Sequence, residues 1–295
     1  MRKILIFVLL IGLNHNLYSV KKNQNKTIDS LTIDKKVSAG LITPYSNDDN
    51  KLYFEIYKNL LGKELLVVTR LAQLPGDYAG YLNAGSKTAE HVVQFEKHAK
   101  KILLKEVSFT NISDEGDPIS LSVAVNNFKP ILGAFDIKNS EDDRYLIDVS
   151  SYFMSDSPGF NIIRSYEKDN YKMGGVDKKR SFIDSARSFP RNTEILHTLT
   201  FSVNKAPRGN ITKTISFQIN HSIIALPDDP MPMRYEDERV GWFTLNKINY
   251  SSEKLKSDSY NIVRKWRLEP SDIDAYNRGE LVEPIKPIIY YLDPG

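Results

Sequence analysis

Zinc chemistry is the first possibility to test, because the chain has no cysteine and only five histidines. These are His15, His91, His98, His197 and His221. No glutamate follows any of them, so the HExxH pattern, which places two zinc ligands on one face of a helix, is absent. The reversed pattern fails too, since Glu90-His91 would need a histidine where Lys87 stands. His91 and His98 flank a predicted turn and could converge across a hairpin, but solvated or core-edge histidines are the simpler interpretation.

Phosphate binding is suggested by one segment and opposed by its spacing. Residues 80–88 read GYLNAGSKT, which is close to a phosphate-binding loop. That loop needs a lysine directly after its second glycine, so that the ammonium group reaches the outer phosphates. Here Ser86 separates Gly85 from Lys87, and the residues that follow have the pattern of a strand. We therefore expect no nucleotide site at this segment.

Nucleophilic and carboxylate chemistry also lack a recognisable pattern. There is no GxSxG motif, and the chain offers no thiol. Acidic residues cluster at 141–143, 228–229 and 236–238, where solvated turns are the usual explanation. Their spacing does not match a calcium loop, although carboxylates distant in sequence can meet in a fold. We predict no catalytic, cofactor-binding or metal-binding residue in this chain.

The N-terminus has the pattern of an export signal. Arg2 and Lys3 precede the apolar run Ile4 to Leu13, which at about ten residues is too short to cross a bilayer. We predict a signal peptide over residues 1–19 and a flexible polar arm over residues 20–37. A buried N-terminal helix or strand is the alternative. Export predicts a periplasmic or extracellular protein with no membrane span after signal removal.

The composition is that of a globular protein that does not bind nucleic acid. Hydrophobic residues make up 41% and charged residues 26% of the chain, as in ordinary folded domains. The formal net charge is only +3, and no long basic cluster is present, which disfavours nucleic-acid binding. The 16 tyrosines and 13 phenylalanines favour strands, where aromatic side chains pack well.

Alternation of apolar and polar residues predicts strands along most of the chain from Ala39 onward. The expected hairpins and strands are 41–45 with 51–57, 65–68 buried on both faces, 91–95 with 102–109, 132–137 with 145–149, 194–203, 212–224, 241–250 and 260–268. Residues 119–127 and 271–278 are the helical candidates, residues 156–179 predict a long loop or lid, and the proline-rich residues 227–232 predict a rigid connector. We predict a mainly β fold, an antiparallel sandwich or barrel-like body with a few short helices.

Seven segments, taken together and in order, resemble one protein family. They are LLGKELLVVTR at 60–70, LNAGSKT at 82–88, RSFI at 180–183, HTLT at 197–200, RVGWFT at 239–244, RKWRLEP at 264–270 and RGELVEPIKPIIYYLDP at 278–294. This pattern resembles the N-terminal region, of unknown function, of large exported bacterial zinc-dependent metalloproteases of the metzincin-like type. The resemblance runs from about Val37 to Gly295.

The resemblance implies a domain order. In that family, the segment similar to Pro287 to Pro294 leads into the protease domain, and the HExxH helix with its third histidine ligand lies beyond it. The chain is then a β-rich N-terminal domain over 38–282 followed by the start of a catalytic domain over 283–295, truncated before the zinc site. Zinc belongs to the full-length family and is not implied here. The implied partner is the downstream catalytic domain, and the substrate a peptide or protein.

Three functions remain open at this level. The first is a non-catalytic front module that scaffolds the protease domain or shapes its cleft and is inactive alone. The second is a stand-alone cell-envelope protein that binds a peptide or glycan, suggested by Trp242, Trp266 and Tyr290-Tyr291. The third is a hydrolase with an unrecognised site. We also expect Ile288 to Leu292 to pack poorly, because the sheet that this strand would join is missing.

Overall fold

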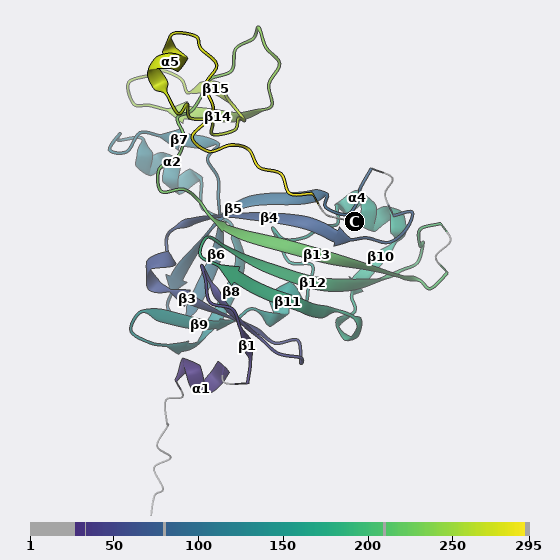
Figure 1. The fold of residues 1–295 in the computed structure, drawn as a ribbon. Coiled ribbons are helices and arrows are strands. Elements are labelled where there is room, and N and C mark those ends of the chain that lie inside the picture. The colour runs from purple at the N-terminus through teal and green to yellow at the C-terminus, as the bar shows by residue number, and fades with distance from the viewer. Residues whose placement is uncertain (1–26, 33, 79–80, 209–210, 293–295) are drawn as a thin grey trace, which may run out of the picture.

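A strongly curved antiparallel sheet forms the body of the protein (Figure 1). The structure is a computed structural model that describes residues 27–32, 34–78, 81–208 and 211–292. In pairing order, the strands of this sheet are β1 (Lys36–Val37), β2 (Thr43–Ser46), β3 (Leu52–Tyr57), β9 (Arg144–Asp148), β8 (Ile131–Ser140), β6 (Lys101–Val107), β5 (Lys87–His98), β4 (Glu64–Gln73), β13 (Thr214–Ala225), β12 (Asn192–Val203) and β10 (Met173–Val176). β11 (Phe182–Phe189) also pairs with β12, beside β10.

A smaller sheet stands above the large one in Figure 1. It consists of β15 (Asp258–Val263), β14 (Thr244–Tyr250) and β7 (Asn111–Ser113). The helices are α1 (Ile28–Thr32), α2 (Ser120–Asn126), α3 (Ser150–Phe153), α4 (Ser165–Tyr171) and α5 (Ile273–Asn277), with the 3-10 turns η1 (Lys58–Leu60) and η2 (Lys178–Arg180). No helix in the described ranges has both the length and the apolar character needed to cross a membrane.

The large sheet curls until its two ends meet at a seam between β2 and β11. There the backbone N–H of Leu41 donates to the carbonyl of Phe189 at 2.8 Å, and that of Ser188 donates to Ser38 Oγ at 2.8 Å. Gly40 makes this approach possible, because a Cβ at this position would lie 2.6 Å from the backbone nitrogen of Phe189. The sheet is therefore nearly a closed barrel, which leaves little exposed strand edge.

The interior of the barrel is filled by alternate residues of the strands, as the period of two requires. On β4, for example, Leu65, Val67 and Leu71 are buried, while Leu66 and Val68 are only partly covered. One core cluster fills the barrel around Phe54, and a second lies around Phe217 toward the far ends of β12 and β13. The prediction that residues 65–68 are buried on both faces was wrong, because at β4 only the inner face of the sheet is fully covered.

The predicted fold class is confirmed, since the protein is mainly β with a barrel-like antiparallel sheet and short helices. The expected hairpins are present as the antiparallel pairs β2–β3, β5–β6 and β8–β9. The two long runs around residue 207 pair as β12 and β13. The helical candidates are α2 and α5, each shorter than expected.

Two expectations are corrected by the structure. Residues 27–37 were assigned to a flexible arm, but they hold α1 and β1, and Ile28 is fully buried against Leu146 and Tyr45. Folded structure thus begins before Ala39, because α1 covers one side of the sheet with an apolar contact. Residues 156–179 were expected to be a loop or lid, but they contain α4 and β10. The predicted signal peptide, residues 1–19, and residues 20–26 of the arm lie outside the described residues.

Candidate functional site

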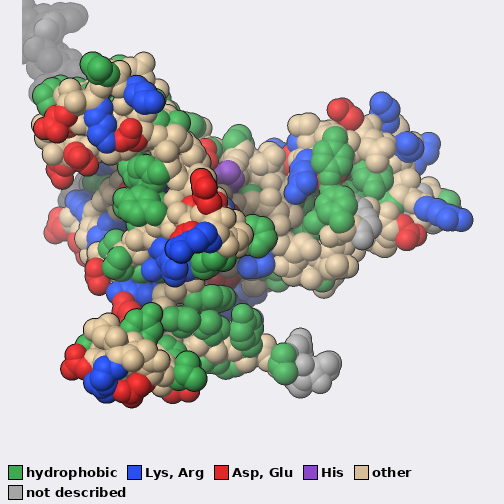
Figure 2. All heavy atoms as spheres, turned by 90° about the horizontal axis from the view of Figure 1, so that it is seen from above, with side chains coloured by type: hydrophobic (Ala, Val, Ile, Leu, Met, Phe, Trp, Pro, Cys, Tyr) green, Lys and Arg blue, Asp and Glu red, His purple; other side chains and the backbone are tan. Residues whose placement is uncertain are grey.

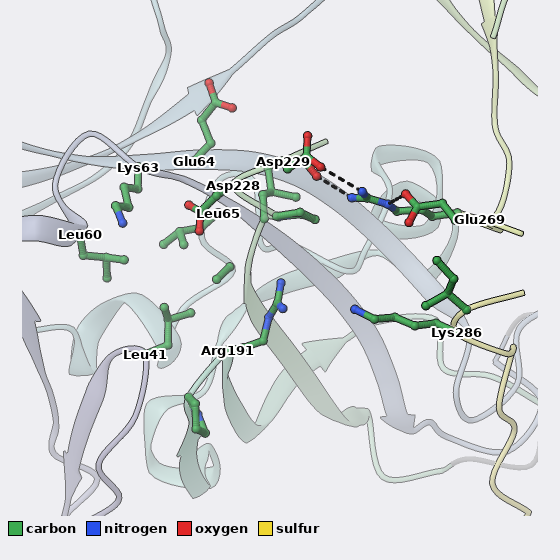
Figure 3. A pocket seen from close by; sticks show the side chains of 16 residues that line it. Leu41, Leu60, Lys63, Glu64, Leu65, Arg191, Asp228, Asp229, Glu269 and Lys286 are labelled. Atoms are coloured by element: carbon green, nitrogen blue, oxygen red, sulfur yellow. Dashed lines mark hydrogen bonds and ion pairs between the residues drawn. The ribbon is translucent and has the colours of Figure 1, made fainter. Parts of the chain in front are cut away.

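A cavity of about 710 Å³ lies between one end of the barrel and the chain after β15 (Figure 3). Its barrel side is apolar and includes Leu41, Leu60, Leu65 and Ala225. Its other side is formed by the proline-rich connector after β13 and by the segment around Ile285. Ligand sites in proteins commonly have this form, an apolar wall with a few charged groups between two packed units.

Arg267 joins the proline-rich connector to the segment that follows β15. Its guanidinium group donates to Glu269 Oε1 at 2.7 Å and to Asp229 Oδ2 at 3.1 Å. These hydrogen bonds raise the pKa of Arg267 above its ordinary value, so it stays fully charged. The C-terminal segment is held beside Glu269, since the N–H of Ile285 donates to the carbonyl of Glu269 at 2.8 Å. The connector and the C-terminal segment thereby form one wall.

Besides Arg267, three basic residues line the cavity, Lys63, Arg191 and Lys286, and the last two are the closer to Arg267 and the C-terminal segment in Figure 3. In Figure 3 the Lys286 side chain extends toward Arg191 from the opposite wall, and the Arg191 side chain runs up between Lys286 and the barrel side. Neither side chain makes a hydrogen bond or ion pair with any of the described residues. Arg191 lies in the tight turn between β11 and β12, and its carbonyl accepts a hydrogen bond from the N–H of Ala225 at 2.8 Å. The arrangement can attract an anion.

A second cluster of titratable groups is enclosed in the barrel. His197 on β12 and His221 on β13 lie with their Nε2 atoms 2.8 Å apart, and Thr69 Oγ1 lies 2.9 Å from His221 Nδ1. Burial lowers the pKa of His197 to about 4, and burial together with His197 lowers the pKa of His221 well below its ordinary value. Both rings are therefore neutral at pH 7, and one donates to the other.

Sequence reasoning missed this pair, although a signal for it was present. Counting by twos from Ile195 to Leu199 and from Ile219 to Ile223 places both histidines on the inner face. The two histidines for which a hairpin site was considered do not converge. His91 and His98 lie on the same strand, β5, at an odd spacing that puts them on opposite faces. His91 instead lies 2.7 Å from Glu106.

The remaining candidate residues lie on the surface. Lys87 starts β5, as the strand pattern after Gly85 predicted. Trp266 and Tyr290 are exposed, and the ring of Trp242 is partly covered by Arg234, whose guanidinium carbon lies 5.2 Å from the ring centre. Within the described ranges, no three His, Cys, Asp or Glu side chains are arranged so that they could hold a metal ion.

Apolar side chains are exposed at two places. From Ile288 to Leu292 the chain is extended but belongs to no strand, and the exposed fraction rises from 39% to 92%. Helix α2 has no buried residue, and its Leu121 and Val125 are 76% and 79% exposed. Figure 2 shows hydrophobic side chains gathered on the upper face of the molecule, including a row along the lower edge of that view. Exposed apolar side chains that lie together commonly mark a contact with another domain or protein.

Two families of known sequences match the chain. Residues 85–271 match the family described as Domain of unknown function (DUF5117), and residues 25–74 match Domain of unknown function (DUF5118). The boundary between the two matches falls between β4 and β5, which pair directly in the sheet. Both segments therefore contribute strands to one barrel. No curated protein and no solved structure matches the chain.

Proposed function

The chain belongs to the DUF5117 family of domains of unknown function, and from this premise we propose that it is the non-catalytic N-terminal module of an exported bacterial zinc-dependent metalloprotease. In this proposal the module is inactive alone and scaffolds a downstream catalytic domain or shapes its cleft. The catalytic domain supplies the zinc site and hydrolyses a peptide or protein. Export to the periplasm or the outside rests on Arg2, Lys3 and the apolar run after them.

The observation that carries the proposal is the exposed apolar segment Ile288 to Leu292. Tyr291 and Leu292 are 91% and 92% exposed, although burying such a side chain stabilises a protein by about 1.5–3 kcal/mol. An extended apolar segment of this kind is suited to pair with a sheet that another domain provides. If the resemblance to metalloproteases holds, the catalytic domain starts within residues 283–295, which include this segment. The barrel has its own core, so it can serve as a rigid support for that domain.

The experiment measures bound zinc and casein cleavage for the purified chain, alone and mixed with a separately produced catalytic half of such a metalloprotease. We expect neither zinc nor cleavage from the chain alone, and a 1:1 complex with cleavage in the mixture. One zinc ion per molecule together with casein cleavage by the chain alone would refute the proposal.

A matched pair of substitutions tests which surface makes the contact. Tyr291→Asp places a charge in the exposed segment and should weaken the complex by about tenfold or more, because an unpaired charge is costly to bury. Leu255→Asp is the control, since Leu255 is fully exposed in the loop between β14 and β15. Equal affinities for the two variants would show that the C-terminal segment is not the docking surface.

A stand-alone peptide- or glycan-binding protein of the cell envelope is the second candidate. The exposed aromatic rings of Trp266, Tyr290 and Tyr291 favour it, because aromatic faces stack on sugars and peptide side chains. Saturable 1:1 binding of one peptide or glycan by the chain alone, lost in Trp266→Ala, would support this function. Failure of the chain to bind the catalytic half would then favour it over the first.

A further inference from the structure

The proposed contact through Ile288 to Leu292 does not use the cavity beside Arg267. We propose that it is a binding site for a small amphiphilic anion, in which a carboxylate or phosphate binds between Arg191 and Lys286 and an apolar body lies against the barrel end. All the residues of this site belong to the chain itself, so binding of the anion requires no protease domain.

Of the basic residues that line the cavity, only Arg267 is paired with acidic side chains. Arg267 already has two carboxylates, because it bonds to both Asp229 and Glu269. Arg191 and Lys286, like Lys63 near the barrel end, have no carboxylate partner among the described residues. Two like charges directed at the same space repel each other, and an anion between them converts the repulsion into two charge-assisted hydrogen bonds.

The backbone holds both cations in place before any ligand binds. The carbonyl of Arg191 is bonded to the N–H of Ala225, at the end of β13. Lys286 follows Ile285, whose N–H is bonded to the carbonyl of Glu269. The backbone of Arg191 is bonded to the sheet, and the backbone next to Lys286 is bonded to Glu269. Binding of an anion therefore costs mainly side-chain entropy, which favours affinity.

The apolar lining of the cavity indicates that the anion also has a hydrocarbon part. Leu41, Leu65 and Ala225 offer an apolar surface beside the two cations, and Ile285 adds to it from the opposite wall. Glu64 is directed away from Arg191 and Lys286 in Figure 3, and Asp228 also lines the cavity. The anionic group therefore binds on the Arg191 and Lys286 side, while a short hydrocarbon chain covers the leucines. The cavity of about 710 Å³ has the size of known small-molecule sites.

The test titrates the isotope-labelled protein with hexanoate, hexyl phosphate and hexanol and follows amide shifts by NMR. We expect saturable 1:1 binding of at least one of the two anions, with shifts around Arg191 and Ile285, and at least tenfold weaker binding of hexanol. Whichever of hexanoate and hexyl phosphate binds more tightly identifies the anionic group. Arg191→Gln and Lys286→Gln should each weaken the better anion about tenfold. Lys256→Gln, an exposed lysine in the loop between β14 and β15, should leave it unchanged.

Thermal unfolding of each variant, which should match that of the unmodified chain, checks that the fold is intact. Three results would each overturn the proposal: no saturable binding of either anion, hexanol binding as tightly as the anions, or unchanged anion affinity in both glutamine variants. The experiment involves no protease domain and no zinc, so its failure is distinguishable from failure of the proposed function.

Discussion

Two neutral histidines in an apolar core, His197 and His221, can take up protons only at a cost in free energy, because burial disfavours the charged imidazolium. Phe153 and Phe160 pack against the pair, and Thr69 is the polar side chain bonded to it. No charged side chain among the described residues bonds to either ring. An unfolded histidine, by contrast, has an ordinary pKa near 6.5 and gains a proton freely below it. The pair therefore links the stability of the barrel to pH.

The folded protein should lose stability as the pH falls from about 6.5 to about 4. Burial depresses the pKa of His197 to about 4, so in this interval the unfolded state binds more protons than the folded state. The stabilisation is complete above pH 6.5, and His197 alone accounts for a loss of about 3 kcal/mol by pH 4. Urea unfolding at pH 7.0, 5.5 and 4.5 measures the change.

The double variant His197→Leu, His221→Leu provides the comparison for this prediction. Its free energy of unfolding should vary less between pH 6.5 and 4 than that of the unmodified chain. His98→Gln, at the exposed end of β5, is the control and should keep the full dependence. The same pH dependence in all three proteins would show that the buried pair is not responsible.

At the scale of elements, the closure of the barrel depends on strands that come from distant parts of the chain. β3 pairs with β9, and β4 lies between β5 and β13. The last gap, between β2 and β11, is bridged by hydrogen bonds near Gly40 rather than by a continuous ladder. Packing at this seam is tight, so a side chain added at Gly40 should lower the stability of the protein.

Gly40→Ala should destabilise the protein by about 1–3 kcal/mol, because the new Cβ would overlap Ser188 and Phe189. Gly175→Ala is the matched control on β10, where a Cβ meets nothing within 4 Å, and its effect should stay within about 0.5 kcal/mol. Urea unfolding at pH 7 compares the two. If Gly40→Ala were as stable as the unmodified chain, the seam would not be closed as described.

At the scale of the whole molecule, the two matched families build one structural unit. The DUF5118 segment supplies β1 to β4, and the DUF5117 segment supplies β5 to β15. The barrel core mixes their side chains, with Phe54 and Leu65 from the first and Phe95, Ile147 and Ile223 from the second. Neither segment encloses this core by itself.

Residues 85–271 expressed alone should therefore fail to fold cooperatively. Removing β3 and β4 leaves β9, β5 and β13 each with an unpaired edge and opens the barrel core to water. Near-UV circular dichroism and urea unfolding test this against a chain covering residues 27–292. A sharp unfolding transition for residues 85–271 with native near-UV signal would contradict the single-unit description.

Local pattern was sufficient for the fold class and for the neighbouring hairpins. Alternation with a period of two is a property of adjacent residues, so β2–β3, β5–β6 and β8–β9 could be predicted without knowing the rest of the fold. The same pattern, counted along β12 and β13, would have put His197 and His221 on the inner face, but the pair was not predicted. The arm before Ala39 was misjudged because the burial of Ile28 comes from a contact with Leu146, which its own neighbours do not reveal.

By itself, then, the sequence determined the mainly β class and the hairpins between neighbouring strands, because these follow from backbone geometry and the order of neighbouring residues. Only the tertiary structure decided that β3 joins β9, that His197 meets His221, and that Arg191 and Lys286 enter one cavity. Each of these contacts depends on how distant strands are ordered in the closed sheet. Strand order is set by the packing of the whole core and leaves no periodic signal in the sequence.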